Sequence, residues 1–376
     1  MRRVLFFLLF LILHLICHGV DKDDDDSSLE IDYSFFDTPE PSTIVKPKDI
    51  FCGPRQICVK RADCIHGRMQ HNSSYSACVS PHVCCDTSLE QNQPNYINDM
   101  EPCGFGTPGN PSSKLSTFGE FPWMIAILER DFNPVDVFTN YVGGGSLLAP
   151  TVVLTTARIA ENKTTDTLFV RAGEYDHTNR QIQHPYQERK VKQIIRHEHY
   201  DPGSLANGTA LLILDTPFNG EVHIRPICLP IFNEFQLLDK SQCIVTGWGS
   251  VTFQQFDYQP RLKKLAMPVL LQSECNAKFR KTRLGPHYQL DQSLLCAGGQ
   301  KNVDACQGDG GSPLICPLVG SKTRYFQVGM VAWGIGCGSA DVPGTYVNVA
   351  YLLPWLREKL NALGVDRKYY ASTSLK

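Results

Sequence analysis

Short apolar runs separated by turn residues fill the chain from about residue 118 to residue 349. Val, Ile, Leu and Tyr are concentrated in runs such as 123–128, 168–171 and 327–331, and Gly and Pro stand between the runs. Runs of this length between turn residues are typical of β-strands. The long body of the chain is therefore expected to be all-β.

One segment near the C-terminus has a different period. Leucines recur at helical intervals between residues 351 and 363, namely Leu352, Leu353, Leu356, Leu360 and Leu363. Apolar residues three and four positions apart lie on one face of a helix. This pattern predicts one amphipathic helix packed on the β body, followed by a tail at 365–376.

Residues 1–20 have the order of charge, apolar core and small residue that marks a secretory signal. Arg2 and Arg3 precede an apolar run over residues 4–16, and Gly19 follows it. The run is shorter than the about 20 residues that a membrane-spanning helix needs, although a signal anchor is the alternative. We assign residues 1–20 to a signal peptide, and expect a secreted, extracellular protein without a membrane attachment.

Composition and charge limit which binding partners are expected and whether the cysteines form disulfides or bind metal. The formal net charge is −2, with basic and acidic residues interspersed, so no single-sign face is expected that would bind nucleic acid. Removing the signal takes Cys17 and leaves fourteen of the fifteen cysteines, an even number that favours disulfides in an oxidising compartment. Zinc is the alternative, but the sequence has no paired C-x-x-C units with His at ligand spacing. No metal or cofactor is expected.

Six cysteines gather in residues 51–86, between polar, Pro-bearing stretches at 21–50 and 87–115. They are Cys52, Cys58, Cys64, Cys78, Cys84 and Cys85. A segment this short cannot bury a core, so cross-links must hold it together, and spacing alone leaves their pairing open. We interpret the two flanking stretches as linkers.

This pattern, ending in an adjacent cysteine pair, resembles the clip domain found ahead of arthropod extracellular proteases. The resemblance implies the bridges Cys52–Cys84, Cys58–Cys78 and Cys64–Cys85. Arg68 lies between the third and fourth cysteines and is a candidate for cutting by an upstream protease. Its alternative interpretation is a simple solvated cation.

The most specific motif of the β-rich body is Cys-Gln-Gly-Asp-Gly-Gly-Ser-Pro-Leu at residues 306–314. It resembles the nucleophile loop of trypsin-like serine proteases. Further family motifs stand around it in the family's order, at residues 121–123, 144–147, 154–157, 210–212, 246–249, 331–334 and 343–346. The resemblance implies a chymotrypsin-like fold for residues 116–364, with two six-stranded antiparallel β-barrels, a cleft between them and a C-terminal helix.

The chemistry of that family needs a hydroxyl nucleophile, an imidazole base and a carboxylate that orients the base. The matching positions here are Gly310, Arg158 and Gly208. Gly310 has no oxygen, and Arg158 stays protonated and cannot act as a base. Ser312 lies two residues too far along the chain to replace the nucleophile, and Ala332 stands where a supporting serine is usual. The sequence therefore predicts a pseudo-protease without peptidase activity.

Part of a binding apparatus remains. Asp304 lies where trypsin-like members place the carboxylate that receives Arg or Lys, and Gly334 and Gly344 match the small residues that leave that pocket open. Either the pocket docks a basic side chain without cutting it, or Asp304 is a relic in a collapsed pocket. The family's Ile-Val-Gly-Gly segment, whose new amine pairs with the counterpart of Asp309, is missing before Phe121. We expect a zymogen-like loop arrangement, with other donors for Asp309 if it is buried.

The resemblance also assigns the other cysteines. It implies the bridges Cys103–Cys228, Cys243–Cys316, Cys275–Cys296 and Cys306–Cys337. The family bridge beside the histidine loop is absent at both ends, where Gly143 and Ile159 stand.

Two further features concern the surface. Sequons make Asn72, Asn162 and Asn207 candidate glycosylation sites, and a glycan on Asn207 would crowd the rim of the former catalytic cleft. His197 and His199 could share a strand face and bind a metal, but they coincide with an ordinary exposed segment of the family, so we favour a structural role.

As a whole, the chain resembles the arthropod clip-domain serine protease homologues, which act as non-enzymatic cofactors or regulators in extracellular cascades. The resemblance implies a haemolymph protein of innate immunity that assists melanisation by prophenoloxidase activation. Its partners would be an active clip-domain protease, prophenoloxidase, or both. The alternatives are an adhesive or developmental matrix protein and an active trypsin-like endopeptidase.

Overall fold

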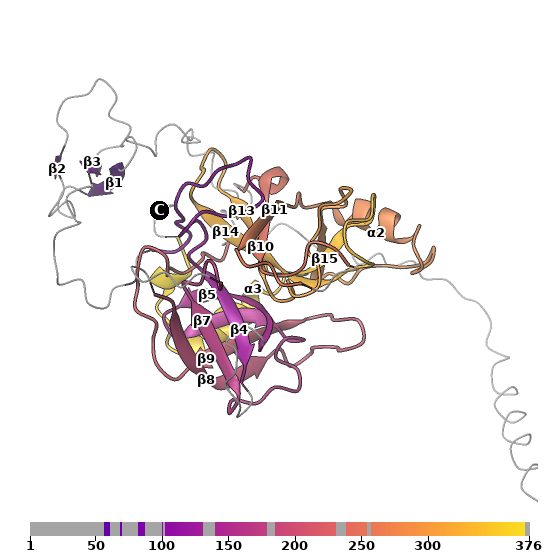
Figure 1. Ribbon diagram of the computed structural model, residues 1–376, viewed down its shortest axis with the longest axis horizontal. Helices are drawn as coiled ribbons and strands as arrows, with labels where there is room; N and C mark the ends of the chain where they lie inside the picture. Colours follow the sequence, from indigo (N-terminus) through magenta and orange to yellow (C-terminus); the bar gives the residue numbers. More distant parts are fainter. Residues whose placement is uncertain are drawn as a thin grey trace, which may run out of the picture. The chain divides into compact units, whose positions relative to one another are not determined.

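The computed structural model describes residues 100, 102–130, 140–178, 185–230, 238–253 and 257–372, together with the backbone of three short strands between residues 56 and 86 (Figure 1). The expected signal peptide, the linker at 21–50, the clip-domain bridges and Asn72 lie outside the described residues.

The three short strands form an antiparallel sheet in the cysteine-rich segment. They are β1 (Gln56–Lys60), β2 (Arg68–Met69) and β3 (His82–Asp86), in the order β1-β3-β2. The pairing sets Cys58 opposite Cys84, and Arg68 opposite Asp86. The candidate processing residue is therefore part of a paired strand.

The body begins with a closed antiparallel barrel. Its strands are β4 (Met124–Glu129), β5 (Tyr141–Ala149), β6 (Val152–Thr156), β7 (Leu168–Ala172), β8 (Gln187–Arg196) and β9 (Thr209–Leu214), paired in the order β4-β5-β6-β9-β8-β7. Ile125, Leu154 and Leu212 from three of these strands are fully buried in its core. The β-branched and leucine-rich runs of the sequence thus become the buried faces of the barrel.

The second set of strands forms a six-stranded antiparallel sheet. It contains β10 (Ile244–Gly247), β11 (Lys263–Ala266), β12 (Leu294–Ala297), β13 (Pro313–Pro317), β14 (Tyr325–Trp333) and β15 (Gly344–Asn348), in the order β11-β10-β13-β14-β15-β12. An isolated bridge between Val269 and Ala297 brings its two ends together. The expected chymotrypsin-like, all-β fold is confirmed.

Helices are short. Within the described residues they are α2 (Gln272–Phe279), α3 (Leu353–Ala362) and the 3-10 turns η4 (Lys240–Gln242) and η5 (Arg367–Tyr369). The helix predicted at 351–363 is α3, and Leu353, Leu356 and Leu360 are buried along one face. None of the helices in the described part of the chain is long and apolar enough to cross a membrane.

Segments that the sequence analysis placed outside the body fold onto it. In the expected linker, the backbone N–H of Gly104 donates to Pro226 O at 2.8 Å, and Cys103 is bonded to Cys228. In the expected tail, Tyr370 is buried and its carbonyl accepts from Leu229 N at 2.8 Å. A covalent or hydrogen-bonded anchor thus fixes each of these segments against the body, although its composition alone indicates a solvated chain.

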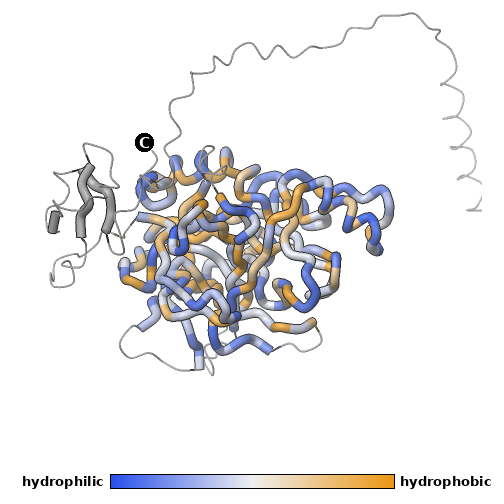
Figure 2. Tube along the Cα trace, turned by 90° about the horizontal axis from the view of Figure 1, so that it is seen from above, coloured by the Kyte–Doolittle hydropathy of each residue, from blue (hydrophilic) through white to orange (hydrophobic). Residues whose placement is uncertain are grey.

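The body contains four disulfides, with the same pairing that the family resemblance implies. They are Cys103–Cys228, Cys243–Cys316, Cys275–Cys296 and Cys306–Cys337. Figure 2 shows hydrophilic stretches in the outer loops, with hydrophobic stretches along the strands between them.

Candidate functional site

The loop at residues 306–312 crosses from the second sheet to the first barrel. The carbonyl of Gly310 accepts a hydrogen bond from Gly144 N in β5 at 2.8 Å, and Gly311 N donates to Val331 O in β14 at 2.9 Å. Position 310 therefore lies where the two halves of the body meet, as a nucleophile position should. It carries no side chain, and a Cβ there would lie 3.3 Å from Ile159 Cδ1.

Gly208, the position that the resemblance assigns to the orienting carboxylate, lies in a tightly folded loop. Gly208 is buried, and its carbonyl accepts from Ala157 N at 2.8 Å. A Cβ at Gly208 would lie 2.7 Å from the carbonyl oxygen of Leu205, which is closer than real Cβ atoms approach. Leu205 and Asn207 have φ of 60° and 53°. Both values lie in the left-handed region, which residues other than glycine seldom adopt. The backbone here has no room for an aspartate.

Arg158 and Ser312 differ in their access to solvent. Arg158 follows β6 and is exposed. Ser312 is completely buried, and its hydroxyl lies 2.1 Å from where a Cβ on Gly144 would be. A substrate cannot reach Ser312 while Gly144 keeps this position, so the structure gives Ser312 no route to act as a displaced nucleophile.

Asp304, Gly344 and Tyr346 lie close together, and these three residues are called the Asp304 recess below. Its Oδ2 accepts a hydrogen bond from Gly338 N at 3.0 Å. Its Oδ1 and the hydroxyl of Tyr346 are buried, and neither has a hydrogen-bond partner within the described residues. A Cβ on Gly344 would lie 3.1 Å from that Oδ1, so any larger residue would press on the carboxylate. Burial raises the pKa of Asp304 to about 6, although backbone N–H groups of Gly338 and Ala305 oppose the shift.

Two buried polar atoms, Asp304 Oδ1 and the Tyr346 hydroxyl, lack hydrogen-bond partners among the described residues. A buried carboxylate oxygen normally has a hydrogen-bond partner, and an exception points to an absent ligand or water. At Gly334, a Cβ would lie 3.2 Å from Gly336 O, a tight contact that favours glycine at this position.

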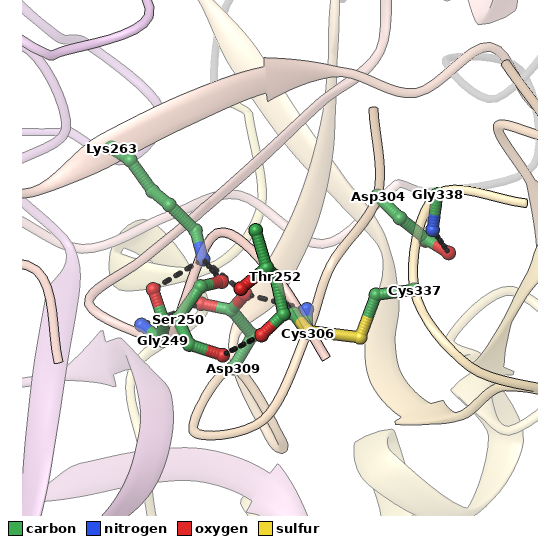
Figure 3. Close-up of a disulfide and its surroundings, with 9 residues drawn as sticks. All are labelled: Gly249, Ser250, Thr252, Lys263, Asp304, Cys306, Asp309, Cys337 and Gly338. Atoms are coloured by element: carbon green, nitrogen blue, oxygen red, sulfur yellow. Dashed lines mark hydrogen bonds and ion pairs between the residues drawn. A yellow bond between two sulfur atoms is a disulfide. The ribbon is translucent and has the colours of Figure 1, made fainter. Parts of the chain in front are cut away.

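Asp309 is the best-satisfied carboxylate of the site. Its Oδ2 accepts from Lys263 Nζ at 2.6 Å and from Cys306 N at 2.9 Å, and its Oδ1 accepts from Gly249 N at 2.9 Å (Figure 3). The expectation that Asp309 would need other donors holds. The zymogen-like loop arrangement stays a prediction, although Lys263 supplies Asp309 with an amine partner from within the chain.

Sequence reasoning missed Lys263. The available signal was a pair of lysines between Leu262 and Leu265 at the start of a strand, where alternation turns one of the two inward.

Comparison with known proteins places this geometry in a family. The trypsin family model matches residues 112–356. The chain belongs to the trypsin family. Phenoloxidase-activating factor 2 of Galleria mellonella is 42% identical over 71% of this chain and 89% of its own length. Inactive CLIP domain-containing serine protease A8 of Anopheles gambiae is 37% identical over 75% of this chain and 78% of its own length. Inactive CLIP domain-containing serine protease A3 of Aedes aegypti is 40% identical over 65% of this chain and 50% of its own length. The chain is thus a homologue of the arthropod clip-domain serine proteases.

This member of the trypsin family has an apolar contact where the resemblance places a lost bridge. Ile159 Cδ1 lies 2.6 Å from the position of a Cβ on Gly143, and Ile159 Cγ1 lies 3.1 Å from that of a Cβ on Gly311. The isoleucine side chain thus fills the space beside these glycines.

The surface features of this trypsin-family body differ in accessibility. Asn162 is exposed, whereas the side-chain amide of Asn207 donates to His199 O at 3.1 Å. The ring of His197 lies 5.1 Å from that of Trp355, and burial lowers the pKa of His197. No cluster of three or more metal-ligating side chains is found among the residues that the structure describes.

Proposed function

We propose that this chain is a secreted, non-catalytic clip-domain protease homologue that binds a basic side chain in the Asp304 recess and acts as a cofactor in an extracellular protease cascade. One observation carries the proposal. A buried carboxylate oxygen without a partner at Asp304 lies a few residues from Gly310, a nucleophile position without a side chain. Recognition and bond cleavage use different groups, so one can persist without the other.

Loss of peptidase activity follows from the chemistry of three positions. Gly310 offers no attacking oxygen, Arg158 cannot accept a proton, and Gly208 has no room for an orienting carboxylate. Three relatives carry the word inactive in their names, which supports the same conclusion.

The cascade is suggested by the names of other relatives. Proteins named phenoloxidase-activating factor match this chain from Galleria mellonella and from Holotrichia diomphalia. We infer that this chain works in the haemolymph during prophenoloxidase activation. Its partner would be an active clip-domain protease or prophenoloxidase itself, engaged through an exposed Arg or Lys.

The first test separates binding from catalysis. The purified full-length protein is treated with a fluorophosphonate serine probe and an Arg-containing fluorogenic peptide, and its affinity for fluorescent 4-aminobenzamidine is measured. We expect no labelling, no turnover, and binding that Asp304→Asn abolishes. Binding should also weaken below pH about 6, because the pKa of Asp304 is about 6 and only the ionised carboxylate attracts a cation. Covalent labelling in the C-terminal half would overturn the non-catalytic assignment.

The second test concerns the pathway. Prophenoloxidase and an active clip-domain protease are mixed with wild-type protein or with Asp304→Asn, and phenoloxidase activity is followed. The proposal predicts enhancement by the wild-type protein and a reduced effect of the variant. Equal enhancement by both would remove the Asp304 recess from the mechanism, and no enhancement by either would remove the cofactor role.

A further inference from the structure

An internal lysine completes a buried ion pair at the base of the candidate site. The side chains of Lys263 and Asp309 are 4% and 1% exposed, and their charged atoms lie 2.6 Å apart. Lys263 Nζ also donates to Gly249 O at 2.6 Å and to Ser250 O at 2.9 Å. An ammonium has three donors, so every N–H of Lys263 has a protein acceptor. Such complete pairing is what makes a buried charge tolerable.

The ion pair is connected to the Asp304 recess through a short series of fixed groups. Asp309 Oδ2 accepts from Cys306 N at 2.9 Å, and Cys306 is bonded to Cys337. The next residue, Gly338, donates its N–H to Asp304 Oδ2 at 3.0 Å. Figure 3 shows Asp309 and Asp304 on the two sides of this disulfide. Asp309 is therefore linked, through one disulfide and two hydrogen bonds, to the carboxylate of the recess.

Strand β11, which carries Lys263, also holds the segment at residues 114–116. Successive residues of a strand face opposite sides, and Lys264 accordingly forms an ion pair with Glu120 instead of Asp309. Lys264 N donates to Lys114 O at 2.8 Å, and Ser116 N donates to Leu262 O at 2.9 Å. Residues 114–116 are thus paired along β11, and a cut near Lys114 would leave its new amine held at this edge.

We propose that Lys263 is a positioning residue that forms the Asp304 recess in the uncut protein, so that binding of a basic side chain needs no cleavage within residues 102–123. The inference rests on the proposed function and adds its regulation. Any control by proteolysis would then act at a different part of the chain.

The experiment uses full-length, uncut protein and 4-aminobenzamidine as the probe. Lys263→Ala should weaken probe binding by about tenfold or more, since the apparent dissociation constant rises in inverse proportion to the fraction of recesses that are formed. Adding n-propylammonium should restore binding by mass action, and n-propanol of the same shape should not. A parallel titration of wild type corrects for direct competition by the amine. Lys263→Arg should retain part of the affinity.

Lys264→Met is the matched control. It removes the same charge from a buried pair one residue along, on the other face of β11. The affinity of this variant for the probe should stay within about twofold of wild type, because substitutions at sites that share no partners have independent effects. A loss equal to that of Lys263→Ala would mean that β11 acts only as general support, and would overturn the positioning role.

A measurement on wild type avoids variants that fail to fold. Hydrogen exchange in the uncut protein should show protection of the amides of Gly249, Cys306 and Gly338, comparable to that of β13. Exposure of these amides while β13 remains protected would overturn the inference.

Failure of the inference can be told apart from failure of the proposed function. If the uncut protein does not bind the probe but protein cut within residues 102–123 does, the role of Lys263 is wrong and the docking function stands. If Lys263→Ala binds as wild type does, the same conclusion follows. If neither cut nor uncut protein binds, the docking function itself is wrong.

Discussion

Asp304 shows how a binding group can oppose the stability of the fold that carries it. Its pKa is raised to about 6, and burial is the main cause. The native state therefore holds a proton more tightly than the unfolded chain does, so stability decreases as pH rises from about 4 to about 6. Above that window the ionised carboxylate remains a standing destabilisation. A buried carboxylate that lowers stability is expected where it serves binding, and not where the pocket has lost its function.

Replacing Asp304 by Asn should stabilise the body at pH 8 by on the order of 2 kcal/mol, because each pKa unit corresponds to about 1.4 kcal/mol. The amide oxygen can still accept from Gly338 N, so the backbone contact is kept. At pH 3.5, where the wild-type carboxyl is protonated, the gain should vanish. Urea unfolding at the two pH values under non-reducing conditions measures both effects. An equal difference at pH 3.5 and pH 8 would contradict the electrostatic explanation.

Among the elements, the loop at residues 201–208 has departed furthest from what a catalytic site needs. Asp201 accepts hydrogen bonds from Gly203 N at 3.0 Å and Ser204 N at 3.2 Å, and this turn leads to the left-handed Leu205. The carbonyl of Leu205 then occupies the space beside Gly208. Restoring the residue types of a triad would therefore not restore its geometry, because position 208 cannot accept a side chain without a backbone shift.

A glycine pair in this loop tests that claim. Gly208→Ala should destabilise the body by about 1–3 kcal/mol through overpacking, a fall in Tm of about 5 °C for a domain of this size. Gly203→Ala should leave Tm nearly unchanged, because the nearest atom to its Cβ is Asp201 Oδ1 at 3.4 Å. Thermal unfolding of both variants by circular dichroism provides the comparison. Equal melting temperatures for Gly208→Ala and wild type would show that the loop relaxes easily.

The same elements show what sequence can and cannot predict. The strands and α3 could be predicted because their apolar period is local, and the resemblance carried the bridge pattern. For Lys263, strand alternation suggests only that one of two lysines points inward. Its partner could not be predicted, since a lysine in a short strand is ordinarily assigned to solvent and Asp309 lies 46 residues further along the chain. The left-handed Leu205 was equally hidden, because no turn residue marks that position.

At the scale of the whole molecule, the covalent connections of the clip segment decide whether a proteolytic cut separates it from the body. The four bridges of the described body use cysteines from Cys103 onward, and they join body residues to each other. In the pairing that the clip resemblance implies, all three bridges, Cys52–Cys84, Cys58–Cys78 and Cys64–Cys85, span Arg68. A cut at Arg68 would then open the clip segment without separating it from the body, whereas a cut within residues 87–99 would release it.

Limited proteolysis with a trypsin-like enzyme tests this arrangement. Protein cut at Arg68 should migrate as one band on a non-reducing gel and as two bands after reduction, and Arg68→Gln should remain whole under the same conditions. The pairing of Arg68 with Asp86 in the β2–β3 ladder also predicts slow cutting, since a protease needs an extended segment free of its strand partner. Opening the clip segment while leaving the Lys263–Asp309 pair intact would let a cascade expose a new surface in a protein whose recess is already formed. Two separate bands without reduction would contradict the implied clip bridges and require a different link between processing and binding.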